Sequence, residues 1–206
     1  FHLAAQSLVN VSYKKPLNTW HTNLIGTLNI LESIKNLNKK CVCVIITSDK
    51  CYKNIETKKG YTETDVLGGE DPYSASKAAA EMAIGSYFKS FLSNKKNLRI
   101  ASARAGNVIG GGDWTKGRLI PDCMVAASKN KIVKIRNLNS TRPWQHVIEL
   151  LYGYLLLAKK LSQNSKINGL SFNFGPNHKN KNFKVKDILV KIKKNWKNFS
   201  FKRDSK

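Results

Sequence analysis

The chain has 206 residues, 41% of them hydrophobic, and 36 Lys and Arg residues against 13 Asp and Glu give it a formal net charge of +23. This length fits one globular domain, or one domain with a small lobe, and no apolar run reaches the roughly 18 residues of a membrane span. The charge alone would indicate a nucleic acid or an anionic membrane as partner. However, only six of the basic residues are Arg, the residue that grips phosphates and bases bidentately, so we expect a soluble protein that binds neither.

The first residues, 1–6, lack an initiator Met and the long apolar middle of a signal peptide. They resemble the tail of a strand. We therefore expect the sequence to be an internal fragment of a fold that begins upstream.

Strand and helix patterns alternate along the rest of the chain. The continuous apolar, β-branched run at 41–46 predicts a strand buried on both faces. Further strands are predicted at 1–5, 99–103 and 171–174, and helices at 17–36, 73–91 and 143–161. In the Lys-rich last segment Val185, Ile188, Leu189, Ile192 and Trp196 recur at helical spacing, which predicts an amphipathic helix in which the chain stops. This order predicts an α/β fold with a Rossmann-like, doubly wound parallel sheet whose N-terminal half is missing.

The cysteines do not form a metal or disulfide pattern. Cys41, Cys43, Cys51 and Cys123 lie within apolar stretches, and no Cys-x-x-Cys or spaced His pair indicates zinc. Buried cysteines usually pack as small hydrophobic residues. We expect reduced thiols, a cytoplasmic location and no metal.

Three polar or small segments follow the predicted strands. They are Ala4-Ala5-Gln6, Thr47-Ser48-Asp49-Lys50 and Ala105-Gly106-Asn107. In doubly wound sheets ligands bind beyond the carboxyl ends of the strands. We expect these three turns to line the active cleft.

Tyr73 and Lys77 stand four residues apart, on one side of a predicted helix. A neighbouring ammonium favours phenolate over phenol, so Tyr73 would be able to take a proton from a substrate hydroxyl. Ser48, directly after a buried strand, would place its hydroxyl in the same cleft. Together the three residues resemble the catalytic Ser, Tyr and Lys of the short-chain dehydrogenase/reductase family.

Further motifs narrow this resemblance to the extended members that act on nucleotide sugars. These are Phe1-His-Leu-Ala-Ala-Gln6, Thr22-Asn-Leu-Ile-Gly-Thr27 and Arg104-Ala-Gly-Asn107. Dehydratases of that group carry two ionisable residues after the catalytic Ser or Thr, and here these are Asp49 and Lys50. With Gly110-Gly-Gly-Asp-Trp114 and Arg142-Pro-Trp-Gln-His146, the pattern is similar to that of the CDP-glucose 4,6-dehydratases.

The resemblance implies a lyase that oxidises, eliminates water and re-reduces on one bound NAD. Tyr73 would take the proton of the 4-hydroxyl, with Ser48 and Lys77 beside it. Lys50 would remove the C5 proton, and Asp49 would protonate the departing 6-hydroxyl. A base must be a neutral amine, which requires burial of Lys50 or a neighbouring cation. The product would be a 4-keto-6-deoxy sugar, used for deoxysugars such as those of lipopolysaccharide O-antigens.

The same resemblance assigns the binding residues. Those assigned to the cofactor are Ala4, Ala5, Gln6, Thr22, Asn23, Thr47, Tyr73 and Lys77, and those assigned to the sugar nucleotide are Asn107, Arg118, Leu119 and Arg142. The planar guanidinium of an Arg suits a diphosphate. Residues 1–116 and 143–178 would be the later part of the NAD-binding domain, and 117–142 and 179–206 part of an interleaved sugar-binding lobe. The helices that begin near 17 and 73 resemble the pair that joins a homodimer in relatives.

Two alternatives stay open. One is an epimerase or dehydratase for a dTDP-, UDP- or GDP-sugar. The Asp49-Lys50 pair argues against an epimerase but does not distinguish between dehydratases for different nucleotides. The other is a basic binding protein without catalysis. The chain also departs from the family: it has no Gly-x-x-Gly-x-x-Gly turn for the dinucleotide phosphates, and Ala105 stands where relatives commonly have Pro.

Overall fold

The computed structural model describes residues 1–56, 60–176 and 183–204. It divides into two compact units, each described separately below. The first, the sheet unit, comprises Phe1–Ala105 and Glu149–Phe174, and the second comprises Gly106–Ile148 and Gly175–Lys206. The sequence placed these boundaries after residues 116, 142 and 178. In the described part of the chain, every helix is too short or too polar to cross a bilayer.

The sheet unit is built on three parallel strands in the order β1-β2-β6. They are β1 (Cys41–Ile46), β2 (Leu98–Ala105) and β6 (Ser171–Phe174). The first and third have the predicted bounds, and β2 is longer than its predicted 99–103. Of the predicted strand 1–5 only His2 pairs, in parallel with Ile45. The chain start therefore lies along the free edge of β1.

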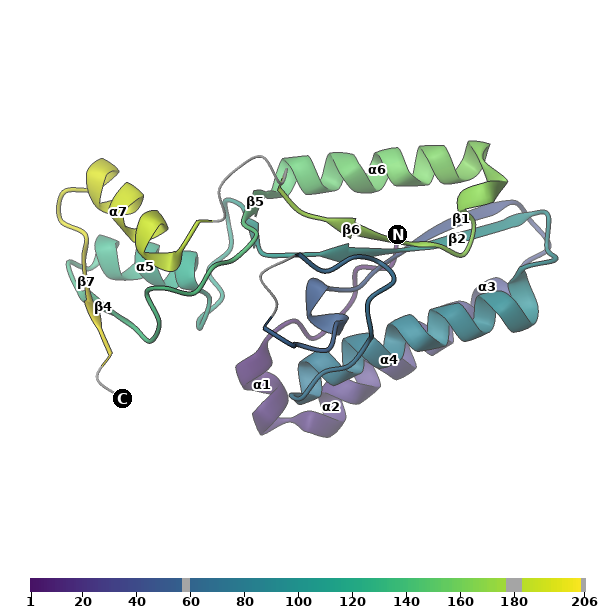
Figure 1. Cartoon of the computed structure of the whole chain (residues 1–206), viewed down its shortest axis with the longest axis horizontal. Helices are drawn as coiled ribbons and strands as arrows, with labels where there is room; N and C mark the ends of the chain where they lie inside the picture. The colour runs from purple at the N-terminus through teal and green to yellow at the C-terminus, as the bar shows by residue number, and fades with distance from the viewer. Residues whose placement is uncertain (57–59, 177–182, 205–206) are drawn as a thin grey trace. The chain divides into compact units, whose positions relative to one another are not determined.

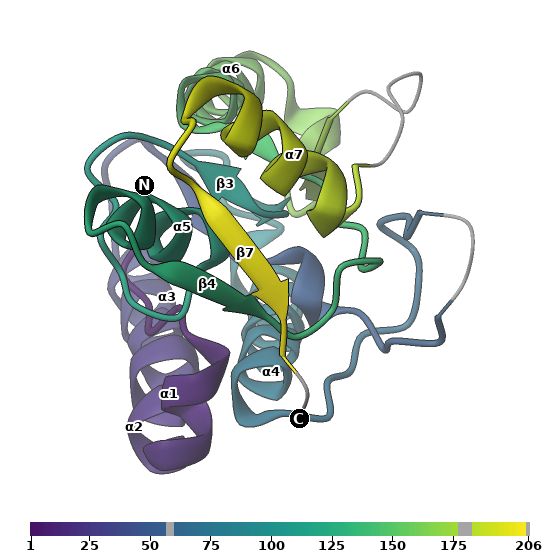
Figure 2. The same cartoon turned by 90° about the vertical axis from the view of Figure 1, so that its left-hand side faces the viewer.

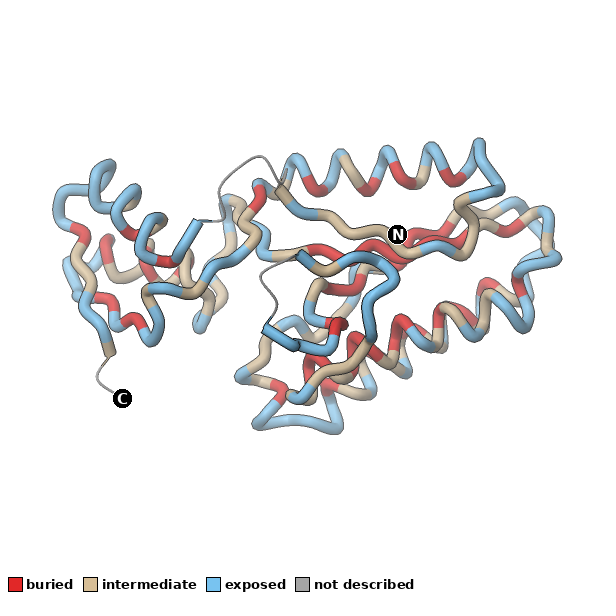
Figure 3. Tube along the Cα trace, viewed as in Figure 1, coloured by how far each residue is buried: buried red, intermediate tan, exposed pale blue. Residues whose placement is uncertain are grey.

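Helices cover both faces of this sheet, as predicted for a doubly wound fold (Figure 1). On one face lie α3 (Gly26–Lys35) and α4 (Pro72–Tyr87), and on the other lies α6 (Val147–Gln163). Because alternate strand residues point to opposite faces, Ile45 packs with the first pair of helices and Val44 packs with α6. Figure 3 shows the resulting band of buried residues along the strands.

The predicted helix at 17–36 is a chain of shorter segments. After α1 (Val9–Lys14) come α2 (Pro16–Trp20), a π-helical turn (His21–Ile25) and α3. A proline at the first position of a helix loses no hydrogen bond, which explains why α2 begins at Pro16. A second π-helical turn, Phe88–Leu92, extends α4 to the predicted end of its helix. Short 3₁₀ turns lie at Asp49–Cys51 and Ser165–Ile167.

The predicted start of the helix at 143 is wrong by four residues. Gln145–His146 form a short strand, β5, that pairs in parallel with β3 (Val108–Ile109). This long-range pairing keeps the residues before α6 extended. The pairing partner lies over thirty residues upstream, so helical periodicity cannot reveal it.

The second unit has its own core. It contains α5 (Leu119–Ser128), β4 (Ile132–Ile135), α7 (Val185–Asn195) and β7 (Ser200–Arg203), and Figure 2 shows β7 beside β4. The two strands pair in parallel. Fully buried Cys123, Leu189 and Phe199 lie at the centre. The prediction that the chain stops in a helix is wrong, because β7 follows α7.

All four cysteines are free thiols. Burial raises the pKa of Cys43 to about 11 and that of Cys51 to about 12. It also raises the pKa of Cys123 to about 12. These three thiols therefore stay protonated at neutral pH and act as core residues.

Candidate active site

The turn after β1 carries three of the predicted catalytic residues. The 3₁₀ turn Asp49–Cys51 is capped by Ser48, whose Oγ accepts a hydrogen bond from the Lys50 backbone N–H at 3.2 Å and donates to Asp49 Oδ1 at 3.1 Å. Ser48 is 7% exposed. The cap fixes the Ser48 hydroxyl at the carboxyl end of β1.

The start of α4 positions Tyr73. Asp71 is the N-cap, and its Oδ1 accepts hydrogen bonds from the backbone N–H groups of Tyr73 and Ser74, each at 3.0 Å. A capping carboxylate satisfies N–H groups that no helical carbonyl reaches. Pro72 is the first helical residue and suits that position. Tyr73 therefore lies in the first turn, with its side chain buried.

Lys77 lies one turn further along α4 and is also buried. Its Nζ donates to the carbonyl oxygen of Ile46, the last residue of β1, at 3.4 Å. Burial lowers the pKa of Lys77 to about 8, although the Glu81 carboxylate opposes this shift. The ammonium thus lies at the strand end from which Ser48 follows two residues later.

The turn and the helix are in contact, so the predicted catalytic residues share one edge of the sheet. α4 packs against the Asp49–Cys51 turn, and the side chain of Cys51 lies in one apolar cluster with Ala78. Asp49 is half-buried, whereas Lys50 is exposed. The burial that the sequence required for a base at Lys50 is found at Lys77 instead.

The turn predicted to hold the cofactor is fastened by Asn23. Its Oδ1 accepts from the Gln6 backbone N–H at 2.8 Å, and its Nδ2 donates to the Gln6 carbonyl at 3.0 Å and to Ser76 Oγ at 2.9 Å. Asn23 is 2% exposed. Its amide therefore ties the turn to α4, and a direct contact between Asn23 and a cofactor stays a prediction.

The other residues predicted to contact the cofactor lie at the same edge. The backbone of His2 pairs with β1 through Val44 and Ile46, so the following Ala4 and Ala5 leave the sheet where β1 ends. Ala4 is exposed, and Thr22 is partly buried. Burial, with the Lys77 charge as a second cause, lowers the pKa of His2.

The side-chain hydroxyl of Thr47 is hydrogen-bonded to a residue that the sequence did not single out. This hydroxyl donates to Oε1 of Glu81, a carboxylate buried under the sheet edge. Glu81 stands one helical turn after Lys77, a spacing that is equally typical of an exposed ion pair. Arg104, which belongs to one of the motifs quoted above, forms a buried ion pair with Glu81, in which Nη2 lies 2.7 Å from Oε2.

The four residues predicted to bind substrate belong to the second unit. Arg118 forms an ion pair with Asp113, Nη1 to Oδ2, at 2.9 Å. Burial raises the pKa of Asp113, but hydrogen bonds from Thr115 and Arg118 outweigh it, so the pKa lies below its usual value. Exposed Arg142 donates from Nη1 to the Thr141 carbonyl at 2.8 Å. Asn107 is exposed and Leu119 is half-buried.

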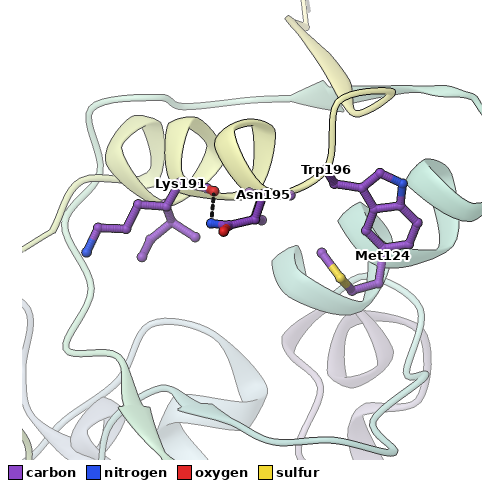
Figure 4. Close-up of a pocket in the computed structure, with 6 residues that line it drawn as sticks. Met124, Lys191, Asn195 and Trp196 are labelled. Atoms are coloured by element: carbon purple, nitrogen blue, oxygen red, sulfur yellow. Dashed lines mark hydrogen bonds between the residues drawn. The ribbon is translucent and has the colours of Figure 1, made fainter.

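An open pocket of about 290 Å³ lies in the second unit (Figure 4). Its lining is mainly apolar and includes Met124 and Trp196, with Asn195 donating from Nδ2 to the Lys191 carbonyl at 2.8 Å. It contains none of the predicted site residues. In the described ranges no group of three His, Cys, Asp or Glu side chains has the arrangement of a metal site.

Comparison with known proteins gives a consistent result. The family model of GDP-mannose 4,6 dehydratase matches residues 1–204. The CDP-glucose 4,6-dehydratase of Salmonella typhimurium is 47% identical over 180 residues, which cover 85% of this chain and 50% of that enzyme. The chain thus spans about half the length of this curated relative.

Solved structures resemble the chain along its whole length. The structure of MoeE5 in complex with UDP-glucose and NAD covers 100% of the chain and 64% of its own length, with a TM-score of 0.84 and 19% identity. The UDP-glucuronic acid 4-epimerase of Bacillus cereus, in complex with UDP-glucuronic acid and NAD, covers 98% and 61%, with a TM-score of 0.83 and 20% identity. At this level of identity the likeness establishes the Rossmann-like fold.

Proposed function

The chain belongs to the GDP-mannose 4,6 dehydratase family, and from this we propose that the complete protein converts CDP-glucose into CDP-4-keto-6-deoxyglucose. The observation that carries the proposal is the capped turn with Ser48, Asp49 and Lys50, packed against α4, the helix that holds Tyr73 in its first turn. The 47% identity to a CDP-glucose 4,6-dehydratase supports the choice of CDP-glucose.

The residues of the sheet unit fit the nicotinamide end of NAD. A buried ammonium at Lys77, donating to a strand-end carbonyl, is suited to hold a ribose hydroxyl, and the small side chains of Ala4 and Ala5 leave room for a ring. When bound, NAD supplies a hydride acceptor for the sugar and later returns the hydride.

Three residues act on the 4-hydroxyl in this proposal. Tyr73 removes its proton, and the Lys77 ammonium favours the phenolate that does so. Ser48 donates a hydrogen bond to the same sugar oxygen, which requires its hydroxyl to turn away from Asp49. The result is a ketone at C4, which acidifies the neighbouring C5 proton.

Asp49 and Lys50 carry out the elimination. In this proposal the bound sugar covers the Lys50 side chain, which is exposed in the structure, and Lys50 then takes the C5 proton. Asp49 delivers a proton to the departing 6-hydroxyl, so that water leaves and a double bond forms between C5 and C6. An epimerase needs no such acid and base. Hydride addition at C6 and reprotonation at C5 then give the 4-keto-6-deoxy product, a precursor of deoxysugars such as those of O-antigens.

In the second unit, Arg142 and Arg118 bind the diphosphate, and Asn107 and Leu119 contact the nucleotide sugar. The ion pair with Asp113 holds the Arg118 guanidinium, a planar, permanently charged donor of the kind that suits a phosphate. The complete protein is a cytoplasmic homodimer in this proposal, joined through the helices of the first unit that include α4.

A substrate panel tests the proposal. The complete protein is incubated with CDP-, dTDP-, UDP- and GDP-sugars, and release of a 4-keto-6-deoxy product is measured, with Tyr73→Phe as the inactive control. CDP-glucose should give the highest kcat/KM. Turnover of another sugar nucleotide alone would refute the choice of substrate, and salt-dependent retention on DNA without turnover of any sugar would favour the binding protein.

A further inference from the structure

The carboxylate of Glu81 is the centre of a buried network that the proposed mechanism does not use. Glu81 is 4% exposed. Its Oε1 accepts a hydrogen bond from Thr47, and its Oε2 accepts from Ser102 at 2.9 Å, from Ser171 at 3.0 Å and from Arg104 Nη2 at 2.7 Å. The carboxylate therefore joins α4 to the end of β1, to β2 and to β6.

Arg104 extends the network to Tyr52. Its Nη1 donates to the Tyr52 hydroxyl at 2.8 Å, and its guanidinium lies 5.1 Å from the centre of the Tyr52 ring. The Tyr52 hydroxyl in turn donates to Asn173 Oδ1 at 2.6 Å. Tyr52 is 4% exposed, so this side chain is held from both sides.

Thr47 and Tyr52 stand immediately before and after residues 48–51. This segment carries the Ser48, Asp49 and Lys50 of the proposed active site. We propose that the four residues Thr47, Tyr52, Glu81 and Arg104, the Glu81 clamp, position this segment for catalysis. The inference rests on the proposed function only for its effect on turnover, because the clamp itself consists of contacts within the sheet unit.

The energetics favour a role in positioning over a role in stability. Removing two ions from water offsets most of their attraction, so a buried ion pair stabilises a fold little, whereas a connected buried network fixes one geometry. Burial lowers the pKa of Arg104, but its hydrogen bond to Glu81 outweighs this and raises the pKa above its usual value. The Arg104 Nε has no hydrogen-bond partner within the described ranges, which is a further cost of this arrangement.

The clamp is tested in the complete protein with two conservative variants and a matched control. Tyr52→Phe removes the hydroxyl that accepts a hydrogen bond from Arg104. Thr47→Val removes the hydroxyl that donates a hydrogen bond to Glu81. Ser102→Ala removes a hydrogen bond to the same carboxylate from a residue that does not flank the segment. Because the variants act at opposite ends of the segment, either one tests the clamp if the other fails to fold.

Amide hydrogen exchange is the first readout and does not depend on any substrate. The Cys51 amide donates to the Ser48 carbonyl at 3.1 Å and the Lys50 amide donates to Ser48 Oγ at 3.2 Å. Loss of one buried hydrogen bond should speed their exchange about tenfold in Tyr52→Phe and Thr47→Val. In Ser102→Ala the two rates should change less than about threefold.

Steady-state kinetics are the second readout. In both clamp variants kcat should fall about tenfold with KM nearly unchanged, because the segment carries the chemistry and not the diphosphate contacts. Unchanged exchange at Lys50 and Cys51, or a loss of kcat in Ser102→Ala equal to that in Tyr52→Phe, would overturn the clamp. If the native protein turns over no nucleotide sugar while the exchange result holds, the clamp stands and the proposed function fails.

Discussion

The Lys77 ammonium is buried at the end of β1, where it donates to the Ile46 carbonyl. Burial lowers the pKa of Lys77 from about 10.5 to about 8. The unfolded chain therefore binds this proton more tightly than the folded one, so that a charged Lys77 destabilises the fold. In the proposed mechanism this loss of stability is offset by function, because the buried ammonium places a positive charge one helical turn from Tyr73.

Lys77→Met should accordingly stabilise the protein near neutral pH. Below about pH 8 the native fold bears the full cost of the buried ammonium, roughly 3 kcal/mol from the shift in pKa. This cost disappears as pH rises from about 8 to about 10.5, because both states lose the proton. Denaturant unfolding at several pH values should show the advantage of Lys77→Met shrinking across that window. An advantage that does not vary with pH would show that the ammonium is not the cause.

Tyr73→Phe should abolish turnover without weakening substrate binding. Removing a general base typically costs about 10²- to 10⁴-fold in rate, whereas the phenyl ring keeps the packing of a residue that is 7% exposed. Calorimetric titration should give a Kd for CDP-glucose within about threefold of the native value. A variant with native kcat would remove Tyr73 from the mechanism.

The residues that the sequence predicted and the buried residues that it did not reveal differ in how far apart their interacting partners lie along the chain. Tyr73 and Lys77 were predicted because a four-residue spacing places them on one side of a helix. Glu81 was not, because its partners Thr47 and Arg104 lie 34 and 23 residues away. A buried Glu and an exposed one have the same local pattern, so only tertiary structure distinguishes them.

At the scale of the element, the Asp71 cap sets where α4 begins and hence where Tyr73 lies. Asp71→Ala should destabilise the protein by about 1 kcal/mol and lower kcat, because the first turn frays. Asp71→Asn keeps an acceptor and should lose less of both. Thermal unfolding and steady-state kinetics of the two variants check this. Equal losses in both would indicate that the charge of Asp71, and not its capping bond, is important.

Elements with strong local signals were predicted, and those that depend on distant pairing were not. β1 has its predicted bounds because it is a continuous apolar run, and β6 has them with an alternation of polar and aromatic residues, Ser-Phe-Asn-Phe. β4 and β7 have only four residues each and pair with each other across more than sixty residues. β7 follows a Lys-rich segment with helical periodicity and carries two basic residues of its own, so it was absorbed into the predicted terminal helix.

At the scale of the molecule, the two units have separate hydrophobic cores, so we expect each unit to unfold locally without the other. Leu189 is fully buried in the second unit and its neighbour Val190 is 52% exposed. Leu189→Ala should cost about 2–5 kcal/mol and Val190→Ala less than about 1 kcal/mol. In the complete protein, native-state hydrogen exchange should then accelerate at β4 and β7 more than at β1 and β2. Equal acceleration in both units would show one cooperative core.

The division into an NAD-binding part and an interleaved sugar-binding lobe stays a prediction, and the two compact units have other bounds than the predicted parts. The sequence placed an interleaved lobe at 117–142 and 179–206, and the second unit comprises Gly106–Ile148 and Gly175–Lys206. The β3 and β5 strands, which pair only with each other among the described strands, account for the extra residues on both sides. Composition does not indicate such a boundary, since Lys residues are spread over both units.

Solvent exchange at C5 of the sugar tests the dehydratase account most directly. In D₂O the complete native protein should convert CDP-glucose into a product with one solvent deuterium at C5. Lys50→Met should still oxidise the 4-hydroxyl, seen as a transient absorbance of reduced cofactor, but should place no deuterium at C5. Lys53→Met, which alters another exposed lysine three residues later, should behave as native. Undiminished C5 exchange in Lys50→Met would contradict the assignment of Lys50 as the base for elimination.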